Sequence, residues 1–132
     1  MLVLTSPHRN LSLQIQVAAL QRYSKENNME IMSEVKVARN LTCDGVAERN
    51  GDIFLFEVKS YDYRYITDAL KRSIERLSKV LKKSDYKEKH IVLILVTKVE
   101  LKVEDINVLQ EKLNCDDLEL TIVNYKINDI LK

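Results

Sequence analysis

The 132-residue sequence contains little that interrupts or cross-links a chain: one proline, two glycines, two cysteines, two histidines and no tryptophan. So few glycines and prolines exclude long flexible linkers, and the length suits one hydrophobic core, so we expect a single domain over residues 1–132. Cys43 and Cys115 form no CxxC pair and histidines are few, so no structural zinc site is expected and both thiols are expected to be reduced.

Long apolar runs are also missing. The longest uninterrupted run covers residues 91–96, which is too short to cross a bilayer. The beginning of the sequence lacks the basic-then-apolar order of a signal peptide. The sequence therefore predicts a cytoplasmic protein with no membrane partner.

A strong excess of either charge is absent as well, because the formal net charge is +1. This balance argues against indiscriminate binding of polyanions, but it conceals an asymmetry. Residues 59–90 contain ten Lys or Arg and five Asp or Glu, whereas residues 99–132 contain four basic and eight acidic residues. The basic middle is either a solvated helix face or a surface for phosphate groups.

The spacing of apolar residues predicts an α/β fold, in which a mixed central sheet has helices on both faces. The expected core order is αβββαβ, followed by αβ. The turn residues Asn50-Gly51 are the strongest short signal for a β-hairpin. The predicted helices cover residues 7–26, 66–83 and 103–113, and the predicted strands cover residues 29–38, 42–49, 52–60, 90–98 and 118–124.

The predicted hairpin brings charged residues together. A two-residue turn at Asn50-Gly51 sets a register in which Asp44 lies opposite Glu57, unless a bulge intervenes. Directly opposed residues share a face with their Cβ atoms about 5 Å apart, and like charges so placed destabilise a sheet. Lys59, two residues after Glu57, shares that face. Two carboxylates and one ammonium therefore converge at the end of an apolar strand.

Such a pair of carboxylates needs a compensating positive charge. Lys59 supplies part of it if the group is an ordinary ion pair at the sheet edge, an interaction that contributes little to stability. A divalent cation held between the carboxylates would compensate the repulsion fully. Geometry alone leaves both interpretations open.

In its context, this arrangement resembles the PD-(D/E)xK nuclease superfamily, which has the restriction-endonuclease-like fold. Asp44 matches the first acid of the motif and Glu57-Val58-Lys59 matches its tripeptide, on consecutive strands between two helices. The resemblance covers roughly residues 7–98, and Cys43 stands where the name-giving pattern has proline. The chain is also similar in size and fold to the archaeal Holliday junction resolvases.

The resemblance implies a metal-dependent endonuclease that hydrolyses phosphodiester bonds of DNA. Asp44, Glu57 and the backbone carbonyl of Val58 would hold Mg²⁺ or Mn²⁺, which prefer oxygen ligands and lower the pKa of a bound water. Lys59 would orient or deprotonate that water, or neutralise the charge that grows on the phosphoryl oxygens.

One feature departs from the superfamily, since many of its members carry a further metal-binding acid on the first helix. The predicted helix over residues 7–26 has only Glu26, at its far end, and Glu30 and Glu34 belong to the next strand. Either one of these acids substitutes, or a second metal site is weak.

Two further groups are candidate contacts for nucleic acid. Tyr61, Tyr63 and Tyr65 alternate along the chain after Lys59, and they either stack on bases or cap the sheet edge. The expected phosphate contacts, chosen by charge, are Arg64, Lys71, Arg72, Lys79, Lys82 and Lys83.

The expected partners are DNA, with branched and single-stranded forms among the candidate substrates, and a second copy of the chain. The dimer interface would involve the acidic C-terminal third or the first helix. The main alternative is a catalytically silent nuclease-like fold that serves as a nucleic-acid-binding or protein-assembly module. An unrelated α/β scaffold, with Asp44 and Glu57 on opposite faces, is the third reading.

Overall fold

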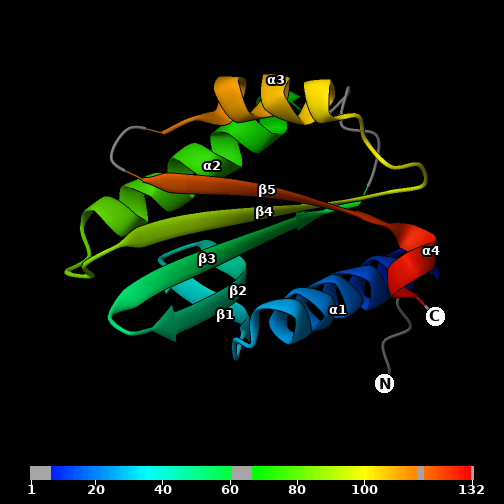
Figure 1. Ribbon diagram of the computed structural model, residues 1–132. Helices are drawn as coiled ribbons and strands as arrows, with labels where there is room; N and C mark the ends of the chain where they lie inside the picture. Colours follow the sequence, from blue (N-terminus) through cyan, green and yellow to red (C-terminus); the bar gives the residue numbers. More distant parts are fainter. Residues whose placement is uncertain (1–6, 61–66, 116–117, 132) are drawn as a thin grey trace.

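The computed structural model describes residues 7–60, 67–115 and 118–131 (Figure 1). Its element order confirms the predicted α/β class. The elements are α1 (Pro7–Asn27), β1 (Met32–Ala38), β2 (Leu41–Arg49), β3 (Asp52–Lys59), α2 (Thr67–Lys82), β4 (Lys89–Thr97), α3 (Val103–Leu113), β5 (Glu119–Lys126) and α4 (Ile127–Ile130).

The five strands form one mixed sheet in the order β1-β2-β3-β4-β5. β1, β2 and β3 are antiparallel neighbours, whereas β3, β4 and β5 are parallel. The predicted hairpin turn is present, because Asn50 has φ 54° and Gly51 has φ 87°, the positive values that a type I′ turn requires at both central residues. β3 thus lies at the centre of the sheet, where antiparallel pairing changes to parallel pairing.

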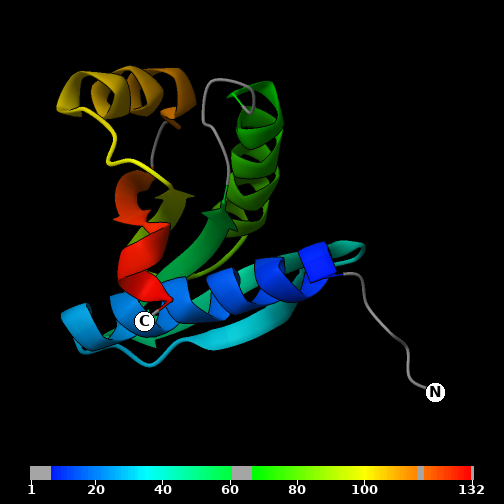
Figure 2. The same cartoon turned by 90° about the vertical axis from the view of Figure 1, so that its right-hand side faces the viewer.

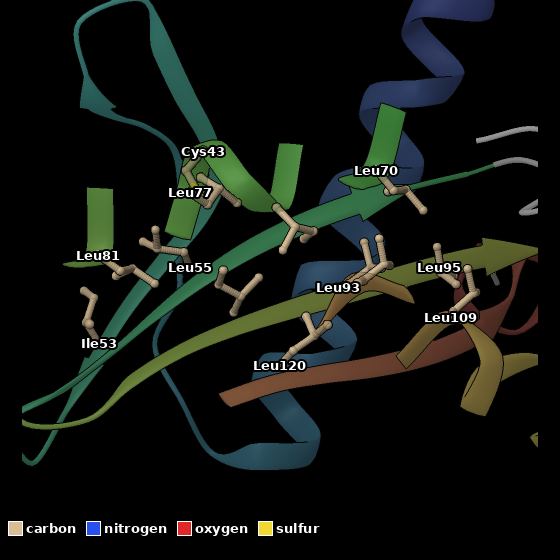
Figure 3. Packing of buried hydrophobic residues seen from close by; sticks show 13 residues of the cluster. Cys43, Ile53, Leu55, Leu70, Leu77, Leu81, Leu93, Leu95, Leu109 and Leu120 are labelled. Carbon is tan, nitrogen blue, oxygen red and sulfur yellow. The ribbon is translucent and has the colours of Figure 1, made fainter. Parts of the chain in front are cut away.

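Helices cover both faces of the sheet, as predicted (Figures 1 and 2). On one face, α2 and α3 bury leucines and isoleucines against β3 and β4; this is the α2-side core, shown in Figure 3. On the other face, α1 and the short α4 pack over a second cluster that contains Phe54, Phe56 and Val92. Because β3 contributes to both clusters, its residues Ile53 to Phe56 are all buried, as their apolar run predicts.

Differences from the predicted elements occur mainly at element ends. Asn28 takes the left-handed conformation with φ 49°, and the N–H of Met29 donates to the carbonyl of Ser24 at 3.0 Å, so the turn that ends α1 uses residues assigned to the next strand. β1 therefore begins at Met32. β5 reaches Lys126, and the final segment, for which no state was predicted, includes α4.

Both cysteines are free, as expected, with Cys43 buried and Cys115 half-buried. Burial raises the pKa of the Cys43 thiol to about 11, so this thiol is protonated at neutral pH. No helix in the described part of the chain is long and apolar enough to span a membrane.

Candidate active site

The carboxyl end of β3 positions the first two charged side chains. The parallel pairing with β4 continues through Glu57 and Lys59, which pair with Leu93 and Leu95, so both residues remain on a rigid strand. The side chain of Glu57 is only 13% exposed and that of Lys59 is 25% exposed. Lys59 Nζ lies 3.3 Å from Glu57 Oε1, which makes the predicted ion pair.

On the other edge of β3, the regular pairing with β2 stops before the site. It runs from the hairpin turn to the pair of Gly45 with Phe56, in the predicted register. Beyond this pair, side chains of β2 replace its backbone: Asp44 Oδ2 accepts a hydrogen bond from the N–H of Val58 at 2.7 Å, and the Cys43 thiol donates to the carbonyl of Phe56 at 3.2 Å. The strands β2 and β3 are thus joined through the Asp44 carboxylate.

This interruption has a cause in β2, which switches faces at Asp44. In a regular strand, residues two apart face the same side. Cys43 packs beside Leu77 in the α2-side core (Figure 3), whereas a Cβ added to Gly45 would lie 3.2 Å from Leu20 Cδ2 of α1, on the opposite face. Asp44 therefore lies at a bend, and the regular backbone pairing predicted for Asp44 and Glu57 is replaced by the hydrogen bond from the Val58 N–H to the Asp44 carboxylate.

The neighbouring strand β1 bends at the matching position. Its pairing with β2 places Glu34 opposite Asp44. Ser33 lines a hollow beside α1 and Val35 lines another beside α2, so the faces switch here too. Glu34 itself has φ 50°, a left-handed conformation that residues other than glycine adopt rarely and at a cost of order 1 kcal/mol.

Burial is the largest influence on the pKa of both carboxylates. Burial raises the pKa of Asp44, with a smaller contribution from Glu34, against the lowering effects of the Val58 N–H and of Lys59. Burial also raises the pKa of Glu57, and the charge of Asp44 raises it further. Lys59 therefore compensates these carboxylates only in part, and the two acids are neighbours, as the sequence predicts.

The oxygen atoms at this point fit a hard divalent cation. Asp44 keeps one carboxylate oxygen beyond its bond to Val58, and Glu57 keeps one beyond its contact with Lys59. In an extended strand the N–H and C=O of one residue point to the same side, so the Val58 carbonyl also faces the gap toward Asp44. Carboxylate and carbonyl oxygens are the ligands that Mg²⁺ and Mn²⁺ prefer.

The donor set is small. Within the described ranges, no three or more His, Cys, Asp or Glu side chains form a group that would hold a metal ion. Glu26 does not substitute for the missing first-helix acid, because its carboxylate accepts hydrogen bonds from Arg22 at 2.9 Å and Tyr125 at 2.7 Å. Of the acids considered from the sequence, Glu34 is the one placed opposite Asp44.

The candidate phosphate contacts on α2 are exposed, but they are spread along the helix. α2 returns from the end of β3 to the start of β4, so its first turn lies toward the site and its last turn lies beside Ile53. Along β3, Ile53 is four residues from Glu57, about 13 Å. The exposed residues are Lys71, Arg72, Lys79, Lys82 and Lys83, and the predicted contacts Tyr61, Tyr63, Arg64 and Tyr65 lie outside the described residues.

Sequence reasoning missed one cation whose charge acts on the carboxylates. Arg76 of α2 donates through Nη2 to the carbonyl of Asn40 at 3.2 Å, in the turn between β1 and β2, and its charge lowers the pKa of Glu57. The sequence identifies Arg76 only as one basic residue among ten in the middle of the chain. Its position becomes evident once the helix is docked on the sheet.

Comparisons of the chain with protein-family models, with curated proteins and with solved structures gave no match.

Proposed function

We propose that the chain is a metal-dependent nuclease that hydrolyses phosphodiester bonds of DNA. The observation that carries this proposal is the convergence of Asp44, Glu57 and Lys59 where the pairing of β2 and β3 opens. Two poorly compensated carboxylates at a fixed strand end are suited to a divalent cation. The resemblance of the motif to the PD-(D/E)xK superfamily assigns the same three residues.

In the proposed reaction, a water oxygen forms a bond to phosphorus while the bond from phosphorus to the leaving sugar oxygen breaks. One proton of the water passes to solvent or to a nearby base, and the leaving oxygen takes up a proton. The products are a terminal phosphate and a free hydroxyl group. A cation held by Asp44, Glu57 and the Val58 carbonyl would supply a water of lowered pKa and polarise the phosphate.

Lys59 has a specific part in this scheme. Its ion pair with Glu57 at 3.3 Å holds it as a cation beside the carboxylates. A cation at this position orients the attacking water and offsets the charge that grows on the phosphoryl oxygens. The ion pair with Glu57 favours this role of Lys59 over that of a general base, because a general base requires a neutral amine.

The basic surface of α2 supports DNA as the substrate. Its exposed lysines and arginines form no sequence-reading pattern, so they would contact the phosphate backbone and make affinity depend on salt concentration. DNA would then lie along α2, with the scissile phosphate at the carboxyl end of β3.

The direct test replaces Lys59 by alanine and compares single-turnover cleavage of labelled DNA in Mg²⁺. We expect a rate lower by about 10²–10³-fold at saturating protein, because a cation acting on the transition state is lost. Lys112→Ala is the matched control, since Lys112 is an exposed lysine of α3. Equal rates for the two variants would contradict the proposed role of Lys59.

A further inference from the structure

The exposed side chain of Arg76 reaches from α2 to the turn between β1 and β2. The next residue, Leu77, is buried beside Cys43 in the α2-side core (Figure 3). Arg76 itself lies on the flank of α2 that also carries Val80, four residues later, and Val80 lines a hollow together with residues of β1 and β2. This flank is the one that faces β1 and β2, and Asn40 precedes the residues of β2 that lie beyond its last pair with β3, Gly45 with Phe56.

One hydrogen bond fixes the direction of the Arg76 side chain. Its Nη2 atom donates to the carbonyl of Asn40, and Asn40 has φ 62° in the turn that leads into β2. Glu57 follows Leu55 by two residues on β3, so its side chain points toward the α2 layer, where Leu55 is buried. Arg76 and Glu57 therefore share one layer of the molecule.

The chemistry of a guanidinium suits a second ligand at this position. Arginine has five N–H donors in a planar fork, and the bond to Asn40 occupies one of them. The acceptor is a neutral carbonyl, so this bond orients the side chain without cancelling its charge. Planar pairs of N–H groups match two oxygens of a phosphate better than the point charge of a lysine does.

We propose that Arg76 binds a non-bridging oxygen of the scissile phosphate and stabilises the charge that develops there during hydrolysis. This assignment rests on the proposed nuclease function. It separates Arg76, which the Asn40 carbonyl holds in place, from the other exposed cations of α2, which would bind neighbouring phosphates and contribute to affinity. The substrate is a phosphodiester whose reacting phosphorus lies between Lys59 and Arg76, on the α2 side of the carboxylates.

The test measures single-turnover cleavage of labelled DNA in Mg²⁺ over a series of protein concentrations, for the wild type, Arg76→Gln and Arg76→Lys. Gln removes the charge and keeps an amide donor for the Asn40 carbonyl. Lys keeps the charge but lacks the planar pairs of N–H donors of the guanidinium. We expect Arg76→Gln to lower the maximal rate by about 10²-fold or more, with the half-saturating concentration changed by less than about 3-fold. Arg76→Lys is expected to recover at least about 10-fold of the lost rate.

Two comparison variants separate catalysis from affinity. Lys79→Gln is expected to raise the half-saturating concentration and leave the maximal rate within about 3-fold, because an outward phosphate contact is lost. Lys112→Gln removes the same charge from α3 and serves as the control. The melting temperature of each variant shows whether a lower cleavage rate is due to unfolding. If Arg76→Gln is unstable, the maximal rate of Arg76→Lys tests the role of Arg76 in its place.

Each outcome has one meaning. A maximal rate of Arg76→Gln close to that of the wild type, or a loss confined to affinity as in Lys79→Gln, overturns the role of Arg76 while the nuclease function stands. If the wild type cleaves no DNA, the proposed function fails and the assignment of Arg76 fails with it.

Discussion

At the scale of single residues, the site is defined by two carboxylates that the fold keeps in an unfavourable environment. Asp44 is half-buried and bound to a backbone N–H, and Glu57 lies beside it with 13% of its side chain exposed. Burial raises the pKa of both groups. If these carboxylates hold the proposed cation, they are expected to lower the stability of the metal-free protein, because their charges are then poorly compensated.

This reasoning predicts the effect of Glu57→Gln on stability. The folded-state pKa of Glu57 is raised above its ordinary value of 4.5, so the folded protein binds this proton more tightly than the unfolded chain does. The free energy of unfolding therefore falls as pH rises from the ordinary value through the raised pKa, and the full penalty is present above the raised pKa. Glu57→Gln removes the penalty, so we expect a higher melting temperature at pH 7 without metal.

Thermal unfolding in EDTA, over a pH series from about 4 to 8, measures this difference. The gap between Glu57→Gln and the wild type should widen as pH rises through the raised pKa. Glu111→Gln, at an exposed position of α3, removes a carboxylate of the same kind as a control. A variant that melts below the wild type at pH 7 would show that the Lys59 ion pair outweighs burial and repulsion.

At the scale of elements, the bend shared by β1 and β2 determines where Asp44 points. Glu34 and Asp44 lie opposite each other, and both strands switch faces there. Gly45 follows the bend immediately and is closely enclosed: an added Cβ would lie 2.8 Å from Ile31 Cγ2 and 3.3 Å from Phe56 Cβ. The backbone of β2 thus approaches Ile31, and to a lesser degree Leu20 of α1, more closely than a side chain would allow.

Gly45→Ala should therefore strain the bend. We expect it to destabilise the protein by about 1–3 kcal/mol, the usual cost of adding a methyl group to a packed site. The cleavage rate should fall as well, because Asp44 is the adjacent residue. Denaturant unfolding measures the stability, with Ser33→Ala, across the strand pair from Gly45, as the control expected to change it by less than about 0.5 kcal/mol. Unchanged stability of Gly45→Ala would mean that α1 yields at no cost.

At the scale of the whole molecule, the fold was largely predictable because its signals are local. Asn50-Gly51 set the hairpin register, and α3 has the predicted bounds. The motif residues Asp44, Glu57 and Lys59 were found because that register brings them together. The start of β1 was misjudged, since Met29 is recruited to the turn after α1 by a hydrogen bond to Ser24 that apolar periodicity does not reveal.

The parts of the site that sequence did not reveal depend on docking between elements. The bend at Asp44 arises because Cys43 fits the α2-side core while Gly45 lies against α1, and neither contact leaves a pattern in a single strand. Arg76 joins the site through the turn at Asn40, 36 residues away. Such contacts are consequences of tertiary packing, so local spacing predicts the motif residues better than it predicts the residues around them.

The central proposal is that Asp44 and Glu57 hold a divalent cation with which the protein hydrolyses DNA. The most direct measurement incubates the wild type and Asp44→Asn with labelled linear, branched and single-stranded DNA, and with RNA, in Mg²⁺, Mn²⁺ or EDTA. Asn keeps an acceptor for the Val58 N–H and removes the charge. We predict cleavage of DNA by the wild type that requires metal, and a loss of at least about 10²-fold in Asp44→Asn. No cleavage of any substrate, with no rise of melting temperature in Mg²⁺, would contradict the claim and favour a catalytically silent binding module.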